Sequence, residues 1–409
     1  MVRRLAISRG NRTIRTAARL LVCALLLHGE AGTAAKPGKA LPMRVAREAM
    51  ERWPNGHIGP RDSAVAWGFE PGILLAGFAA LWDSTGDKAC FNYIQQSIDQ
   101  FVLPDGSIRS YDPNAYALNN ILMGRDLLLL YRVTGDTKYR TAADHLQQQL
   151  ATQPRTASGG FWHAQATPNL MLLDDQFMVA PFAAEYAVMF HRPEELAGIA
   201  DQFVLIYRHA RNPANGLLYH GWDESRSATW ANPNTGTSPN EWARGMGWFM
   251  MALVDTLPFY PQSDPNRAVL LGLFRQTASA VIAAQDPVTG LWHQILDKPR
   301  EKDNYVESSS VLMLIYALEK GVRLGFLPQR YGQNVERAWG AIKQRFVKVT
   351  PAGEYTITGT VTHIAMGASE KDDGSDGYYL HAPVASDDPK GVGAFLLAVT
   401  EMEIRNRTH

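Results

Sequence analysis

The chain has 409 residues, of which 46 % are hydrophobic and 20 % are charged, as is typical of a globular protein with a large core. Basic and acidic residues number 40 each, so the formal net charge is zero. Because the basic residues are scattered and no overall field exists, neither nucleic acid nor an anionic membrane surface is expected as a partner.

The first 35 residues are predicted to be a secretory signal peptide. Six arginines precede the apolar run "LLVCALLL" at 20–27, and small residues follow it up to Ala35, where cleavage is expected. The run is too short to span a bilayer comfortably, although a membrane anchor is the alternative reading. No linker or low-complexity segment follows, so residues 41–409 are predicted to form a single domain.

Cysteine usage agrees with export from a bacterial cell. Cys23 would leave with the signal peptide, and Cys90 would be the only cysteine of the mature chain. Neither a disulfide within the chain nor a cysteine-based metal site is then expected. Cys90 is predicted to be a buried packing residue, and the mature protein is expected in the periplasm or outside the cell, as a monomer or weak dimer.

Helical periodicity dominates the chain from about residue 44 to the end, and strand patterns are scarce. Gly, Pro and Asp-rich turns close most of the periodic segments. These segments predict about twelve helices, at 44–53, 70–85, 88–102, 117–134, 137–151, 174–190, 194–210, 240–258, 265–284, 304–324, 332–347 and 389–405.

A weak internal repeat indicates that the helices form hairpins. The segments "LWDSTGD" at 81–87 and "LYRVTGD" at 130–136 match with an offset of 49 residues. In each, a helix is expected to end at Gly and an Asp to cap the next helix. Hairpins of this length are typical of an open solenoid or a closed toroid. Six hairpins fit a closed, all-α (α/α)6 barrel with a cleft built by the loops at one end.

Two adjacent acids, Asp174 and Asp175, open the apolar helix predicted at 174–190. Carboxylates are favoured at a helix N-terminus, so a capping role is the plain explanation for either one. A capping role explains the two acids together less well, because a helix needs only one N-cap residue. A carboxyl group on an apolar wall at the mouth of a cleft is a candidate proton donor.

Three histidines end similar loop segments, "GGFWH" at 159–163, "GLLYH" at 216–220 and "GLWHQ" at 290–294. A single histidine is more often an ordinary polar residue than a ligand, but the repetition suggests that some of His163, His220 and His293 face the cleft. Their spacings match no zinc signature, so no metal is proposed.

The segment "NEWARGMGW" at 240–248 places Trp242, Arg244, Gly245 and Trp248 together. Arg is a planar partner for a carboxylate, Gly permits close backbone approach, and Trp offers stacking area, a set that suits an acidic sugar. The alternative is that the tryptophans belong to the core and Arg244 pairs internally. Nucleophile elbows, P-loops and dinucleotide fingerprints are absent from the sequence, and no cofactor is expected.

Taken together and in order, seven motifs make the chain resemble the unsaturated rhamnogalacturonyl hydrolases, glycoside hydrolase family 105. The resemblance covers nearly all of the mature chain and rests on "GRDLLLLYRVTGD" (124–136), "QPRTASGGFWH" (153–163), "LLDDQFMVAPFAAEY" (172–186), "GLLYHGWDES" (216–225), "WARGMGW" (242–248), "DNYVESSSVLMLIYAL" (303–318) and "DDPKGVGAFLLA" (387–398).

The resemblance implies an (α/α)6 barrel that needs no metal and acts on oligosaccharides ending in a 4-deoxy-4,5-unsaturated galacturonyl residue linked to rhamnose. It also implies an Asp four residues before Met and seven before Pro, which Asp174 satisfies and Asp175 misses by one place. Asp174 would be the general acid and base, and Asp175 a neighbour that caps the helix or tunes the site. Residues expected to bind substrate are Phe69, Asn119, His163, Asp175, His220, Trp242, Arg244, Gly245 and Trp248.

Asn119 is a departure, because the family usually has Asp in the matching position of "YALNNILMGR" (116–125). Asn keeps the shape and the hydrogen bonds but not the charge, so activity, proton balance or substrate is expected to differ. Phe69 likewise stands where the family commonly has Tyr.

Three other interpretations remain open. The related unsaturated glucuronyl hydrolases share the barrel and the chemistry but act on glycosaminoglycan-type products. Sugar epimerases use the same barrel with histidine pairs, which His163 and His220 could mimic. A noncatalytic glycan-binding protein, with Asn119 as a sign of lost activity, is the interpretation from another class.

Overall fold

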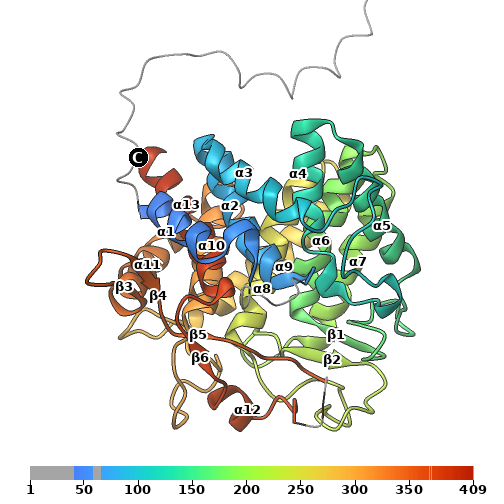
Figure 1. The fold of residues 1–409 in the computed structure, drawn as a ribbon. Coiled ribbons are helices and arrows are strands. Elements are labelled where there is room, and N and C mark those ends of the chain that lie inside the picture. Colours follow the sequence, from blue (N-terminus) through green and yellow to red (C-terminus); the bar gives the residue numbers. More distant parts are fainter. Residues whose placement is uncertain (1–40, 59–65, 368, 370, 409) are drawn as a thin grey trace, which may run out of the picture. The chain divides into compact units, whose positions relative to one another are not determined.

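Six of the described helices form a closed ring at the centre of the fold, and Figure 1 labels them. The computed structural model describes residues 41–58, 66–367, 369 and 371–408; the predicted signal peptide lies outside this part. Each ring helix packs against the next, and the last packs against the first. The ring therefore confirms the closed barrel over the open solenoid. In order its members are α2 (Phe69–Thr85), α4 (Gly124–Thr134), α6 (Leu173–Met189), α8 (Ala243–Thr256), α10 (Ser308–Arg323) and α13 (Pro389–Thr408).

A second layer of helices covers the ring from outside, one for each inner helix. All residues of inner helix α8 are buried, whereas an outer helix buries one face only, at the spacing of three or four expected for an amphipathic helix. Helix α1 precedes the ring in sequence but covers its last member, α13. The outer helices are α1 (Leu41–Arg52), α3 (Lys88–Asp99), α5 (Thr137–Thr152), α7 (Glu195–Ala210), α9 (Pro265–Ala283) and α11 (Tyr331–Phe346).

The hairpin repeat is confirmed in atomic detail. Gly86 and Gly135 end α2 and α4 in the left-handed conformation, with φ of 68° and 72°. Asp87 and Asp136 then cap α3 and α5, because their carboxylates accept from the backbone N–H two residues on, at 2.8 and 3.0 Å.

One predicted helical boundary needs correction, and one short helix was not predicted. The helix predicted over 117–134 begins only at Gly124, and Leu118–Asn120 form a separate 3-10 turn. This turn is held away from the helix because the backbone N–H of Leu118 donates to the carbonyl of His163, 3.0 Å away. The short helix α12 (Asp376–Leu380) has no counterpart in the prediction. Three further 3-10 turns lie at Pro54–Gly56, Pro113–Ala115 and Leu257–Phe259.

Strands are few and short, as predicted, and form three antiparallel pairs within the described chain. Figure 1 shows β1, β2, β5 and β6 with α12 below the helices, whereas β3 and β4 lie to the side. The pairs are β1 (Leu170–Leu172) with β2 (Gly221–Asp223), β3 (Val347–Val349) with β4 (Tyr355–Ile357), and β5 (Thr360–Val361) with β6 (Val384–Ala385).

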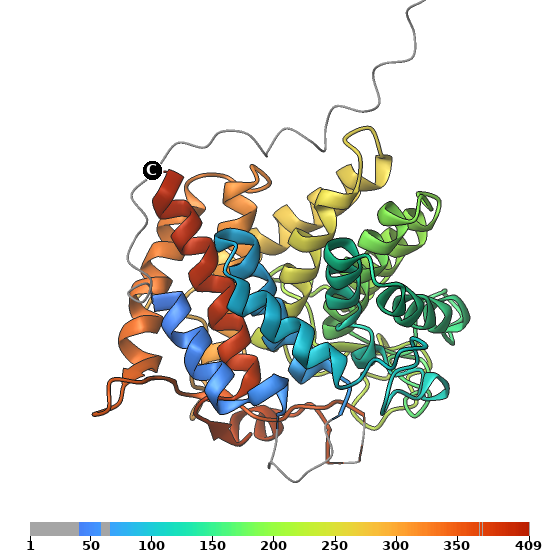
Figure 2. The ribbon, with the colours of Figure 1, turned by 45° about the horizontal axis from the view of Figure 1, so that its top comes forward.

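Glycine sets how closely the inner helices approach. A Cβ added to Gly393 of α13 would lie 2.4 Å from the carbonyl oxygen of Ile73 in α2, so only hydrogen fits there. Figure 2 shows the first and last ring helices side by side. In contrast, Gly340 on outer helix α11 has nothing within 4 Å of such a Cβ.

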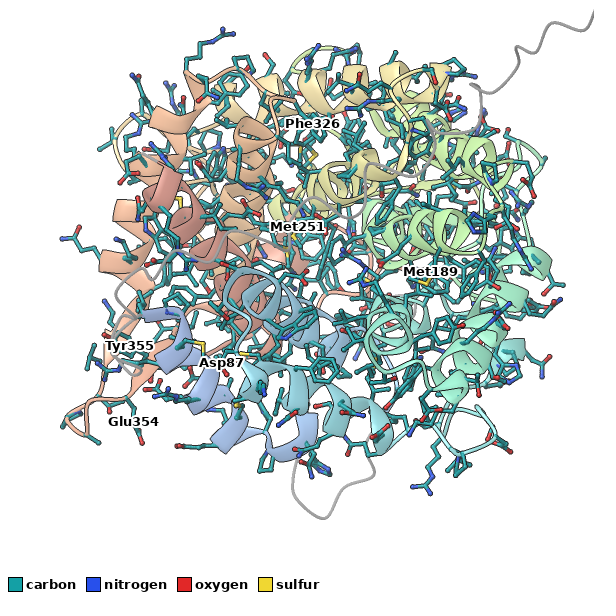
Figure 3. The ribbon with its side chains drawn as sticks, turned by 90° about the horizontal axis from the view of Figure 1, so that it is seen from above. Asp87, Met189, Met251, Phe326, Glu354 and Tyr355 are labelled. Carbon is teal, nitrogen blue, oxygen red and sulfur yellow. The ribbon has the colours of Figure 1, made fainter. Side chains whose placement is uncertain are left out.

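Figure 3 looks along the helices from the end opposite the strands, where the labelled Asp87 follows α2 and Met189 ends α6. Cys90 is buried and unbonded to another cysteine, as predicted. None of the helices described is both long and apolar enough to cross a membrane.

Candidate active site

A pocket opens at the N-terminal ends of the inner helices. Eight of the ten residues predicted for the site line it, and Asp175 and Gly245 lie directly behind its wall. The lining residues are Phe69, Asn119, His163, Leu172, Asp174, Met178, His220, Trp242, Arg244, Trp248, Thr362, His363, Ile364, Ala365 and Lys390.

Strand pairing brings Asp174 to His220. Leu172 of β1 lies opposite Gly221 of β2, so the residue that precedes β2 meets the first turn of α6. The backbone N–H of Leu173 donates to the carbonyl of His220 at 3.0 Å, and His220 Nε2 lies 3.1 Å from Asp174 Oδ2. Asp174 is 16 % exposed. Within the described part of the chain its other oxygen, Oδ1, has no hydrogen-bond partner, so it is available to a ligand.

Asp175 has a separate, structural role. Its side chain is buried, Oδ2 accepts from the backbone N–H of Leu172 at 2.8 Å, and Oδ1 lies 2.6 Å from Nδ1 of His163. It thereby closes the first turn of α6 from the third helical position, while Leu172 is the N-cap residue. Neither acid is the N-cap itself, which corrects that reading of the pair.

The pKa of His163 reflects two opposing effects. Burial alone would lower it, but the nearby Asp175 carboxylate outweighs burial, and the pKa is raised above its ordinary value. The ring is therefore held by a charge-assisted hydrogen bond, with its other edge toward the pocket.

His220 connects Asp174 to a residue that sequence reasoning missed. On its far side, Nδ1 lies 2.7 Å from the hydroxyl of Tyr379, which is fully buried. The ring of Trp242 packs against both, with centroids 4.5 Å from His220 and 5.7 Å from Tyr379. Burial raises the pKa of Tyr379 well above its ordinary value, and the Asp174 charge adds to this, so the hydroxyl stays protonated.

Arg244 is buried and partly committed to the protein. Its Nη1 donates to the carbonyl of Val361 at 2.6 Å and to Ser309 Oγ at 3.2 Å, and its guanidinium lies over the ring of Trp242 at 4.8 Å. The alternative of internal pairing is thus correct for this amino group, although Arg244 also lines the pocket.

The rest of the 242–248 motif shapes the wall. A Cβ on Gly245 would come within 3.2 Å of His220 Cδ2 and 3.6 Å of Asp174 Oδ2, so the missing side chain leaves room for that pair. Trp248 packs against Phe177 of the core, with ring centroids 5.2 Å apart and planes tilted by 32°. Both tryptophans are buried, as the core alternative required, and both also reach the pocket.

The opposite wall of the pocket is formed at the N-terminal ends of the first and last ring helices, α2 and α13. Lys390 Nζ contacts Glu70 Oε1 at 2.7 Å and Asp388 Oδ1 at 3.0 Å, and lies 5.8 Å from the ring centroid of Phe69. Asn119 enters this wall from its 3-10 turn, and its side chain has no hydrogen-bond partner among the described residues.

Several pocket residues were not predicted, and two of the three loop-end histidines, His163 and His220, line the pocket. Lys390 lies in the quoted motif at 387–398 but was not singled out, and the segment 362–365 carries no sequence signal. His293 does not line the pocket; its Nδ1 is buried without a partner in the described chain. No group of three or more metal-ligating side chains occurs in the part of the chain that the structure describes.

The closed double ring of helices is an (α/α)6 barrel, and the site places a carboxylate at the N-terminal end of an inner helix. Comparison with known proteins gives the family. A model of Glycosyl Hydrolase Family 88 matches residues 43–406, and the chain belongs to this family.

Known relatives agree with the resemblance to family 105. The solved structure of a family 105 glycoside hydrolase from C. acetobutylicum is 34 % identical, with a TM-score of 0.84 over 89 % of this chain and 99 % of that one. Protein Atu3128 of Agrobacterium fabrum is 37 % identical over 230 residues, which cover 55 % of this chain and 97 % of that protein. The unsaturated rhamnogalacturonyl hydrolase YesR of Bacillus subtilis is 27 % identical over 283 residues, 68 % of this chain and 75 % of YesR.

Proposed function

We propose that this glycoside hydrolase removes a terminal 4-deoxy-4,5-unsaturated galacturonyl residue from rhamnogalacturonan oligosaccharides, with Asp174 as the general acid and base. The observation that carries the proposal is the Asp174 carboxylate: one oxygen is held by His220, and the other faces the pocket with no protein partner in the described chain. Similarity to YesR supports the substrate class.

The proposed reaction is hydration of an enol ether. Protonated Asp174 donates its proton to C4, and positive charge develops at C5 and the ring oxygen. Water then adds at C5 and returns a proton to the Asp174 carboxylate, so the enzyme ends as it began. The resulting hemiketal opens, and the glycosidic bond is lost. One carboxyl group suffices for this sequence, unlike the pair of carboxylates in ordinary glycosidases.

The neighbouring residues have matching roles in this proposal. His163, which is favoured in its charged form by Asp175, supplies a cation near the uronyl carboxylate. Trp242 and Phe69 offer apolar surface to the sugar ring. Arg244 contributes the guanidinium atoms that Val361 and Ser309 leave unused.

The first test follows the ultraviolet absorbance of the conjugated double bond in an unsaturated galacturonyl–rhamnose disaccharide. The mature protein should abolish the absorbance, whereas Asp174→Asn should lower kcat by at least about 10³-fold while still binding the sugar, because no proton donor remains. Asp175→Asn is the adjacent control. It should lower the stability of the protein more than its catalytic rate, because the Asp175 carboxylate anchors α6 and His163.

Other outcomes would favour other functions. Turnover of an unsaturated glucuronyl disaccharide alone would assign the glucuronyl activity. Inversion of a saturated sugar would indicate an epimerase. Saccharide binding without turnover, equal in wild type and Asp174→Asn, would indicate a noncatalytic glycan-binding protein.

A further inference from the structure

We infer that Tyr379 is a positioning residue which, through His220, directs the catalytic proton to the pocket-facing oxygen of Asp174. The inference rests on the proposed function, since it concerns the acid and base role of Asp174. It is carried by a row of three hydrogen-bonded side chains, in which the Tyr379 hydroxyl lies 2.7 Å from His220 Nδ1 and His220 Nε2 lies 3.1 Å from Asp174 Oδ2.

The donors and acceptors of the three side chains determine which atom donates in each hydrogen bond. An ionised carboxylate only accepts, so Nε2 must carry a proton when Asp174 is charged. A neutral imidazole then has a bare Nδ1, and the Tyr379 hydroxyl must donate to it. Met366 Sδ, 3.4 Å from the same hydroxyl, is the other acceptor within reach and is weaker than the imidazole nitrogen.

The consequence for catalysis concerns the two oxygens of Asp174. While Nε2–H occupies Oδ2, a proton that arrives on the carboxylate is placed on Oδ1, which faces the pocket and has no other partner in the described chain. If His220 adopted the other tautomer, its bare Nε2 would draw the carboxylic proton to Oδ2, away from the substrate. Tyr379 disfavours that tautomer, because its hydroxyl would then accept from Nδ1–H and could donate only to the weak acceptor Met366 Sδ.

The segment that carries Tyr379 is anchored as a positioning device requires. Lys298 Nζ contacts Asp376 Oδ1 at 2.6 Å, and Asn240 Nδ2 donates to the carbonyl of Gly374 at 2.8 Å. These contacts tie the start of α12 to loops of the barrel. The Tyr379 ring itself is buried against Trp242 and Ile295, so the hydroxyl position is set by packing.

The adjacent tyrosine provides a matched control. Tyr378 is in the same helix, and its hydroxyl donates to the carbonyl of Ala365 at 2.7 Å and contacts Asp372 at 3.1 Å, without reaching His220. Tyr378→Phe and Tyr379→Phe therefore each remove one hydroxyl oxygen from neighbouring positions. The first hydroxyl contacts Ala365, and the second contacts His220.

The test compares steady-state kinetics of both variants on the unsaturated disaccharide. Tyr379→Phe should lower kcat about tenfold with little change in KM, and should move the alkaline limb of the pH–rate profile to higher pH, because Asp174 loses part of the hydrogen bond that favours its charged form. The charged and titratable groups that raise the pKa of Tyr379 electrostatically are Asp174, Asp373 and Tyr378. Of these, only Asp174 is one of the three hydrogen-bonded side chains. Tyr378→Phe should leave the alkaline limb in place, and any loss through Ala365 of the pocket wall should fall on KM rather than on kcat.

A measurement without turnover separates this inference from the proposed function. Nitrogen-15 spectra of histidine-labelled protein, assigned by His220→Gln, should show a protonated Nε2 and a bare Nδ1 in the wild type and in Tyr378→Phe. Tyr379→Phe should show a mixture of tautomers. An unchanged tautomer in Tyr379→Phe, or an Nδ1-protonated wild type, would overturn the inference, whatever the enzyme's substrate is.

Discussion

At the residue scale, Asn119 is the most informative single position. It faces the same pocket as Asp174 and has no side-chain partner in the described chain, so a carboxylate could replace its amide without breaking a hydrogen bond. In Asn119→Asp, two carboxylates would share the pocket, and ionisation of both would be resisted. The alkaline limb of the kcat profile should therefore move to higher pH.

The adjacent Asn120 supplies the control for this substitution. Its carbonyl accepts from Trp67 Nε1 at 2.7 Å, and it lies outside the Asp174 pocket. Asn120→Asp adds the same charge nearby and should leave the pH–rate profile unchanged. Equal shifts in both variants would mean that general surface charge, rather than a shared site, moves the profile.

At the element scale, glycine distinguishes inner helices from outer ones. Gly393→Ala places a methyl group 2.4 Å from a backbone oxygen of α2, which no rotamer change can relieve. The free energy of unfolding should fall by about 1–3 kcal/mol, the range for overpacking. Gly340→Ala, on outer helix α11 with open space around it, should instead raise it by about 0.5–1 kcal/mol. Urea titrations of the two variants check both signs.

Most of the helices were predictable from the sequence, whereas the site was predictable only in part. The period of apolar residues and the Gly–Asp repeat around residues 86 and 135 are local signals, and the structure agrees with them. The 3-10 turn that holds Asn119 depends on a hydrogen bond to His163, and Tyr379 meets His220 across 159 residues of sequence. Such contacts leave no periodic pattern, so only the three-dimensional structure reveals them.

At the scale of the whole molecule, a charged cavity of about 350 Å³ lies among the inner helices, away from the site pocket. Most of its charges are paired: Asp255 contacts Arg125 at 2.8 Å and Lys320 at 2.7 Å. Asp126 lines the same cavity, is buried, and has no ion-pair partner in the described chain. Burial raises its pKa to about 8, despite the opposing effect of Arg125.

This buried acid predicts how stability depends on pH. Because the pKa of Asp126 is about 8 in the folded protein and its ordinary value is 3.8, the folded state holds a proton that the unfolded state has lost between these values. Ionisation of Asp126 therefore does not affect the free energy of unfolding below about pH 4. Between about pH 4 and pH 8 it lowers this free energy progressively, and above about pH 8 the loss is complete. Asp126→Asn should leave the stability near pH 4 almost unchanged and raise it by a few kcal/mol at pH 9.

Denaturant unfolding at pH 4 and pH 9 measures this difference, provided that both transitions are two-state. Asp201→Asn, an exposed change on outer helix α7, is the control and should have the same small effect at both values. If Asp126→Asn also behaved in this way, Asp126 would not be the group that couples the cavity to pH.

Closure of the ring by α2 and α13 has a consequence for how the protein is made. Lys390 meets Glu70 across 320 residues of sequence, and Gly393 meets Ile73. During synthesis α2 is made early, and the apolar surface that it buries against α13 stays exposed until almost the whole chain has been translated. A nascent chain that stops before Pro389 would lack both the last inner helix and the lysine of the pocket wall, so such fragments should be held by chaperones or degraded rather than persist as partly active enzyme.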